Sequence, residues 1–62
     1  MHEEFLTIEE LALRWKKKVQ AIYWMRSRGQ GPEAVRVGRT LRWRLSDVSA
    51  WEERQAASDR RR

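Results

Sequence analysis

The sequence predicts a small α+β domain in which two helices pack on a two-stranded antiparallel ribbon and a third helix follows. In the first half of the chain, apolar residues recur every three or four positions, which is the spacing of a helix with one buried face. Between positions 35 and 45 they alternate with arginine, which is typical of strands with one buried side. A cluster of glycine and proline at positions 29–32 separates the two patterns. The order of elements is therefore helix, helix, hairpin, helix.

The composition allows one small core and excludes several classes of protein. A chain of 62 residues forms a single domain, and without cysteine it has neither disulfides nor thiolate metal ligands. No apolar run approaches the ~20 residues of a transmembrane helix. We therefore expect a marginally stable, cytoplasmic protein with no membrane partner. Its expected parts are an N-terminal tail (residues 1–5), a folded domain (6–57) and a basic C-terminal tail (58–62).

The first helix is predicted to begin after Thr7. A threonine followed three residues later by Glu10 forms a capping box. The apolar stripe of this helix consists of Ile8, Leu11, Ala12 and Trp15. Phe5 and Leu6, which precede the cap, are expected to fold back as a hydrophobic staple.

The second helix is predicted over residues 19–28, after a turn at residues 16–18. One continuous helix would leave a fully charged turn of three lysines in the apolar seam, so a turn is the better interpretation. Gly29 is placed to close the helix in the left-handed conformation. Ile22 and Met25 share the side expected to face the core.

The other side of the second helix has the chemistry of a DNA-recognition surface. It carries an amide, a phenol, an indole and a hydroxyl, from Gln20, Tyr23, Trp24 and Ser27. Arg26 and Arg28 lie at its edges, and Lys16, Lys17 and Lys18 lie at its entrance. Such groups can hydrogen-bond to base edges and contact phosphates in a major groove.

The hairpin and the last helix complete the domain. Val35, Val37, Leu41 and Trp43 are expected to pack on the helices, and Leu45 continues the alternation of the second strand. Gly38, Arg39 and Thr40 form the expected connection. Ser46 is expected to cap the last helix, with Asp47 in its first turn and with Val48 and Trp51 facing inward. Residues 52–55 look solvent-facing, and the chain beyond Ala57 should fray.

The charge is concentrated in the middle of the chain. The net charge is +5, but residues 14–44 alone hold ten Lys and Arg against the single acid Glu33, a local charge of +9. The segments on either side are acidic or neutral. This distribution favours a polyanionic partner over a uniformly solvated surface.

The sequence resembles the MerR-like winged helix-turn-helix proteins that include phage excisionases, also called recombination directionality factors. The resemblance covers about residues 6–53, and its most specific part is the run RVGR followed by WRLSDV and a tryptophan. It further rests on Glu10, Leu11, Ala12, Arg14, Trp15, Ile22, Tyr23, Gly29, Gly31, Pro32, Val35 and Arg42. Mycobacteriophage and actinobacterial versions are the most similar. Relatives commonly carry a glycine, an apolar residue and a capping residue where this chain has three lysines, and often an arginine at the position of Trp24.

The resemblance implies that residues 18–28 enter the major groove and that the hairpin tip is a wing that touches the adjacent minor groove or phosphates. The expected major-groove contacts are Lys17, Lys18, Gln20, Tyr23, Trp24, Arg26, Ser27 and Arg28. The expected wing contacts are Arg36, Gly38, Arg39, Thr40 and Arg42. An excisionase of this kind would bind direct repeats in attachment-site DNA cooperatively, beside neighbouring copies of itself, bend that DNA and direct an integrase toward excision.

Two other functions stay open at this point. A small transcriptional regulator could use the same fold, and a protein-interaction adaptor could use Trp24 and the arginines on an acidic protein. Stacking of single-stranded bases on tryptophan is less favoured, because Trp15, Trp43 and Trp51 fall on apolar stripes, although an exposed role stays open for Trp24. Catalysis finds no support: His2 stands alone, and Glu9 and Glu10 point in different directions on a helix. We therefore expect no catalytic residue, metal site or cofactor.

Overall fold

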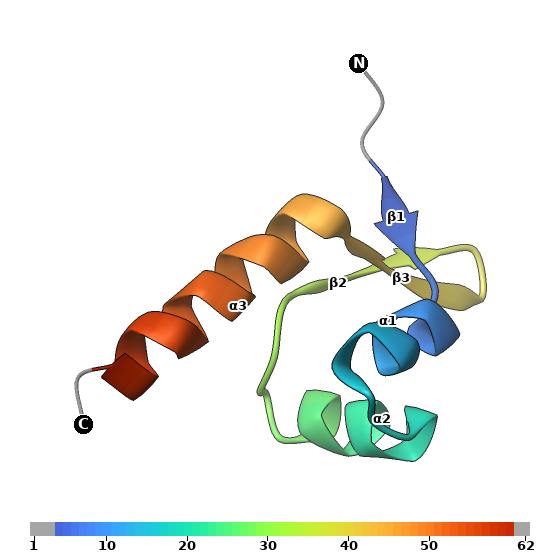
Figure 1. The fold of residues 1–62 in the computed structure, drawn as a ribbon. Coiled ribbons are helices and arrows are strands. Elements are labelled where there is room, and N and C mark those ends of the chain that lie inside the picture. The colour runs from blue at the N-terminus through green and yellow to red at the C-terminus, as the bar shows by residue number, and fades with distance from the viewer. Residues whose placement is uncertain (1–3, 61–62) are drawn as a thin grey trace.

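The computed structural model describes residues 4–60 and contains three helices and a three-stranded antiparallel sheet (Figure 1). The elements in chain order are β1 (Phe5–Leu6), α1 (Ile8–Trp15), α2 (Val19–Ser27), β2 (Ala34–Val37), β3 (Thr40–Arg44) and α3 (Leu45–Arg60). The predicted α+β arrangement of helix pair, hairpin and closing helix is confirmed, and the sheet gains one short strand.

The additional strand is β1, which pairs with β3 and places β3 in the centre of the sheet. Phe5 lies opposite Arg44 and Leu6 lies opposite Trp43. The Leu45 N–H extends this pairing by donating to the Glu4 carbonyl at 2.9 Å. Phe5, which the sequence analysis placed at the end of the N-terminal tail, thus belongs to the sheet; residues 1–3 of that tail lie outside the described residues.

Helix α1 begins with the predicted capping box. The Glu10 N–H donates to the Thr7 hydroxyl at 3.0 Å, and the Thr7 N–H donates to the Glu10 carboxylate at 2.8 Å. Two backbone donors that the helix leaves without an internal partner are satisfied in this way.

The turn between α1 and α2 is formed by the three lysines, as predicted. Lys16 ends α1 in the left-handed conformation with φ +56°, and the Lys17 N–H reaches back to the Ala12 carbonyl at 2.9 Å. Lys18 is the N-cap of α2 and makes no side-chain capping hydrogen bond. Lys16 thus occupies a left-handed backbone conformation that glycine, which has no Cβ, adopts at lower cost.

We expect Lys16→Gly to stabilise the domain by about 0.5–1 kcal/mol, because the relief of strain outweighs the greater freedom of glycine in the unfolded chain. Urea unfolding at constant salt measures the change. Lys17→Gly is the matched control, since φ at Lys17 is not positive. Equal effects of both substitutions on the unfolding midpoint would contradict the strain at Lys16.

Helix α2 ends in a Schellman motif around Gly29, which confirms the predicted left-handed conformation of this residue. Gly29 has φ +70°, its N–H donates to the Arg26 carbonyl at 3.0 Å, and the Gln30 N–H donates to the Met25 carbonyl at 2.9 Å. This turn directs the chain away from α2 and toward the start of β2.

The hairpin connection is shorter than predicted, and this changes the side on which the valines lie. Val37 pairs with Thr40, so the loop consists of Gly38 and Arg39 alone. Gly38 has φ +62° and Arg39 has no positive φ, which is the pattern of a type II′ turn. Directly opposed residues share a face of the sheet, and a shift of one residue reverses the face.

The helix-facing side of the sheet therefore carries Leu6, Ala34, Arg36, Leu41 and Trp43. Val35 and Val37 lie on the opposite side, and Val37 is 52% exposed. The expectation that both valines pack on the helices was wrong, because it placed Thr40 in the loop instead of in the ladder.

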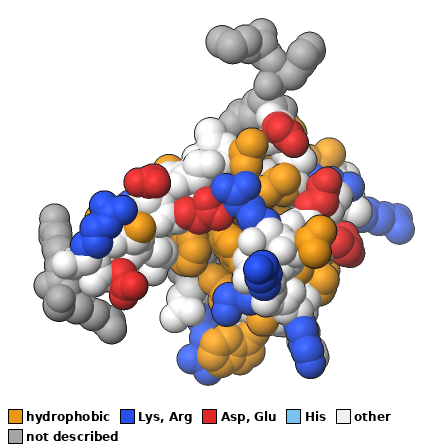
Figure 2. All heavy atoms as spheres, viewed as in Figure 1, with side chains coloured by type: hydrophobic (Ala, Val, Ile, Leu, Met, Phe, Trp, Pro, Cys, Tyr) orange, Lys and Arg blue, Asp and Glu red, His pale blue; other side chains and the backbone are white. Residues whose placement is uncertain are grey.

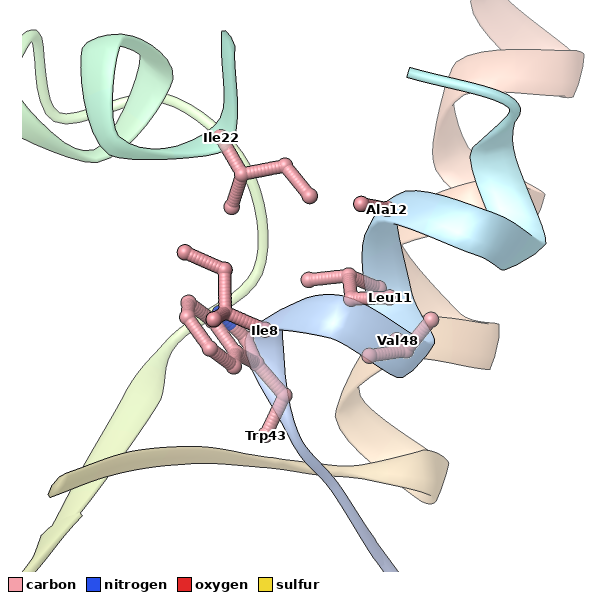
Figure 3. Close-up of a cluster of buried hydrophobic side chains, with 6 residues drawn as sticks. All are labelled: Ile8, Leu11, Ala12, Ile22, Trp43 and Val48. Carbon is pink, nitrogen blue, oxygen red and sulfur yellow. The ribbon is translucent and has the colours of Figure 1, made fainter. Parts of the chain in front are cut away.

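The core gathers side chains from all three helices and the central strand. It consists of Ile8, Leu11 and Ala12 from α1, Ile22 from α2, Trp43 from β3 and Val48 from α3, and Figure 3 shows these six pointing toward one another. Leu6, Trp15, Val19, Ala34 and Leu41 cover them as partly buried neighbours. The orientation of α2 relative to the hairpin is thereby set by apolar packing.

Helix α3 is longer at both ends than predicted. It begins at Leu45, directly after β3, so Leu45 is helical and Ser46 lies inside the helix instead of capping it. Asp47 is in the first turn, as expected. The helix continues to Arg60, past the predicted fraying at Ala57, because residues 52–57 are strong helix formers without glycine or proline. In Figure 1 its second half projects beyond the rest of the domain.

An ion pair joins α1 to α3. The Arg14 guanidinium binds the Glu52 carboxylate through two hydrogen bonds of 2.7 Å, and the Trp15 indole N–H donates to the same carboxylate at 2.8 Å. The rings of Trp15 and Trp51 lie 5.1 Å apart beside it. The sequence analysis expected residues 52–55 to face solvent, whereas Glu52 is partly buried in this ion pair. The hydrogen bonds from Arg14, and to a lesser extent that from Trp15, lower the pKa of Glu52 to about 2.

We expect this pair to stabilise the domain by about 1 kcal/mol, since both side chains are partly exposed and solvent screens their attraction. The folded pKa lies below the unfolded value of about 4.3, so the stabilisation is complete above about pH 5 and is lost as the pH falls toward 2. Glu52→Gln should therefore lower the free energy of unfolding at pH 7 and approach the wild type below about pH 2.

Urea unfolding at a series of pH values measures this dependence. Glu53→Gln is the matched control, because Glu53 is the exposed neighbour on the same helix. An unchanged pH dependence in Glu52→Gln would contradict the contribution of the ion pair.

Candidate nucleic-acid interface

The outward face of α2 is exposed, as the helical spacing predicts. Ile22 is buried and Val19 packs beside it, whereas Tyr23 is 53% and Trp24 is 55% exposed. The other exposed side chains on this helix and beside its two ends are those of Lys17, Lys18, Gln20, Arg26, Ser27 and Arg28. Every residue expected to enter a major groove is thus exposed on α2 or directly beside its ends.

Three of these residues, Trp24, Ser27 and Arg28, take part in local contacts. The Arg28 guanidinium lies over the Trp24 ring, 3.8 Å from its centroid, as a cation–π pair. The Ser27 hydroxyl donates to the Trp24 carbonyl at 2.8 Å, so its proton is used within the helix and its oxygen is left to accept. Arg28 therefore lies on the Trp24 side of the helix.

A cationic cleft lies between α2 and the hairpin. Its lining comes from the start of α1, from α2 and from both strands: Thr7, Ile8, Glu9, Tyr23, Arg26, Arg36, Arg39, Thr40, Leu41 and Arg42. Four arginines contribute to this one surface. Of these, Arg36 lies on the helix-facing side of β2, where the two-residue loop places it.

The hairpin presents its arginines beside a tight two-residue turn. The Thr40 hydroxyl donates to the Val37 carbonyl at 2.9 Å, and Arg42 donates to the Leu41 carbonyl at 2.9 Å. Gly38 has open space around it, so the backbone at the tip is accessible. All five residues expected in the wing lie on this hairpin, and all except the partly buried Arg42 are exposed.

Four residues of this lining were not among the contacts expected from the sequence, namely Thr7, Ile8, Glu9 and Leu41, and Glu9 is the charged one. Glu9 lines the cleft beside the arginines, although its position in the first turn of α1 indicates only a favourable interaction with the helix dipole. The pairing of a helix start with a hairpin tip is set by the tertiary arrangement, and no local pattern in the sequence signals it.

The surface over α2 combines charge with apolar area. In the view of Figure 2, blue Lys and Arg side chains surround an orange hydrophobic patch at the end of the molecule where α2 lies in Figure 1. Within residues 4–60, no group of three or more His, Asp or Glu side chains is arranged to hold a metal ion. Nor is any helix in that range both long and apolar enough to cross a membrane.

A protein-family model described as a helix-turn-helix domain matches residues 5–56. The chain belongs to the helix-turn-helix domain family. The match spans β1, the α1–turn–α2 unit, the hairpin and most of α3. Comparison with curated proteins and with solved structures found no match.

Membership of the helix-turn-helix family supports sequence-specific binding of double-stranded DNA. In this family architecture the second helix of the unit is the recognition helix, which lies in the major groove while the first helix crosses the backbone. In this chain the second helix is α2, which carries the exposed polar and aromatic face.

Proposed function

We propose that this helix-turn-helix protein is an architectural DNA-binding protein of the excisionase type. Copies of it bind short direct repeats in attachment-site DNA, bend that DNA and direct an integrase toward excision, without catalysing a reaction themselves. The observation that supports this most strongly is the exposed face of α2 beside a cleft lined by four arginines. A helix in the major groove and a basic wing on the adjacent backbone would hold a curved DNA path.

In this proposal α2 reads the bases and the hairpin positions the protein. Gln20 suits a bidentate contact to adenine, and the wing arginines Arg36 and Arg39 suit phosphates or the adjacent minor groove. Lys17 and Lys18 stand at the N-terminus of α2, where the helix dipole also favours a phosphate. All of these side chains are exposed, so binding requires no rearrangement of the core.

The second half of α3 is proposed to contact the neighbouring copy on the repeats. It projects beyond the domain, and its side chains at positions 53–55 and 57–60 are exposed (Figure 1). A variant that ends at Ala56 keeps the residues matched by the family model. We expect it to bind a single repeat with unchanged affinity and two adjacent repeats without cooperativity.

Gel-shift titration on one and two repeats of an attachment site measures this effect, with scrambled duplex as the control. Neutralisation of about five phosphates predicts a log–log slope of affinity against salt of about −4 to −5. Equal affinity for attachment-site and scrambled duplex would contradict sequence-specific binding. Cooperative binding by the shortened chain would contradict the role of α3.

An in vitro excision assay with an integrase that acts on the same attachment-site DNA separates this proposal from a transcriptional regulator on the same fold. The proposal predicts that the protein increases excision and that no excision occurs on a substrate with scrambled repeats. Specific binding without any effect on excision would favour the regulator.

A further inference from the structure

The recognition helix carries a second, chemically different surface on the side of α2 that faces away from the cationic cleft. This surface, here called the Trp24 patch, is lined by Lys17, Lys18, Gln20, Ala21 and Trp24. None of these residues lines the cleft between α2 and the hairpin. Helix α2 thus presents the cationic cleft on one flank and an apolar patch with a basic rim on the other.

The Trp24 ring is held in place although it is exposed. It is 55% exposed and lies outside the core cluster, so its burial contributes little to folding. Arg28 covers the ring at 3.8 Å from the centroid, which limits its rotation and places a further positive charge beside the patch. The patch is therefore suited to a partner that offers a small apolar group close to negative charge.

Duplex DNA offers one such group in the major groove. The C5-methyl of thymine is the apolar feature among the hydrogen-bonding base edges, and phosphates flank it on both sides. Gln20, on the rim of the same patch, has the side chain that pairs bidentately with adenine. A thymine and an adenine at neighbouring positions would match the indole and the amide.

We propose that Trp24 recognises the 5-methyl group of a pyrimidine, which is thymine in unmodified DNA, next to the base contacted by Gln20. The inference rests on the proposed DNA binding by α2, and it names the chemical group of the DNA that Trp24 contacts. The lysines neutralise the flanking phosphates, and Arg28 fixes the ring.

The test replaces thymine with deoxyuridine, which removes the methyl group and leaves the hydrogen-bonding edge unchanged. A binding duplex is first selected from a random pool, and each thymine is then replaced in turn. One position should weaken binding of the wild type about fourfold, the effect of one buried methyl group at ~0.8 kcal/mol. The Trp24→Ala protein should bind the thymine and deoxyuridine duplexes equally well.

Leu13→Ala is the matched control, because Leu13 is an exposed apolar residue on α1, 80% exposed, and should leave the methyl effect unchanged. Circular dichroism verifies that both variants are folded. If selection yields a duplex but no thymine position is sensitive, or if Trp24→Ala keeps the sensitivity, the Trp24 assignment is overturned while DNA binding stands. If Trp24→Ala only abolishes cooperativity between copies, the patch contacts protein and the assignment is also overturned. Failure to select any duplex overturns both proposals.

Discussion

Trp43→Ala is expected to unfold the domain at 25 °C. Trp43 is 2% exposed, lies on the central strand between Leu6 and Ala34, and contributes to the core shared by all three helices. Removal of a buried tryptophan costs about 3–5 kcal/mol, and a core of this size supplies a net stability of about the same amount. No other single side chain of the core offers as large an apolar area.

Far-ultraviolet circular dichroism and urea titration measure the effect. Trp24→Ala is the matched control, since it removes the same side chain from a position 55% exposed and should change the free energy of unfolding by less than about 1 kcal/mol. A Trp43→Ala protein with a cooperative transition near the wild-type midpoint would show that the core does not depend on this residue.

The second large effect is expected on DNA binding, where Gln20→Ala and Arg39→Ala should differ in kind. Gln20 lies on the outward face of α2, so its loss should weaken the specific duplex by about 1–3 kcal/mol and leave random duplex unchanged. Arg39 lies at the hairpin tip, so its loss should weaken all duplexes alike and reduce the salt slope by about one.

Fluorescence anisotropy at several salt concentrations, on the selected duplex and on a scrambled one, distinguishes the two variants. Both residues are exposed, so the variants should unfold with wild-type midpoints. If Gln20→Ala lowers the affinity for both duplexes equally, the bases are read by other residues of α2.

Local patterns in the sequence predicted the elements that depend on local contacts. The capping box at Thr7, the charged turn before α2 and the left-handed Gly29 each follow from residues a few positions apart. The division of α2 into a buried and an exposed face follows from helical spacing alone. The exposure of the candidate contact residues on α2 was therefore predictable.

The register of the hairpin was not predictable, because it depends on whether the loop contains two or three residues. With Thr40 in the ladder, Arg36 turns toward α2 and Val35 turns away, which reverses the predicted faces of β2. Arg36 is one of the four arginines that line the cationic cleft, and this register places it on the helix-facing side. The repeated sequence pattern of valine and arginine fits either register.

Contacts between segments far apart in the chain could not be predicted from the sequence either. Arg14 and Glu52 are 38 residues apart, and each taken alone looks like an ordinary exposed charge. The sequence analysis expected the chain beyond Ala57 to fray. Helix α3 instead continues to Arg60, because the preceding residues 52–57 have high helix propensity.

The central claim, that the outward face of α2 and the hairpin tip contact DNA together, is tested most directly by nuclear magnetic resonance. Isotope-labelled protein is titrated with the selected duplex, and changes in the backbone amide signals are followed. The largest changes are expected at residues 17–28 and 36–40. Largest changes on the outward side of α1, at Glu10 and Leu13, with α2 unaffected, would contradict the claim.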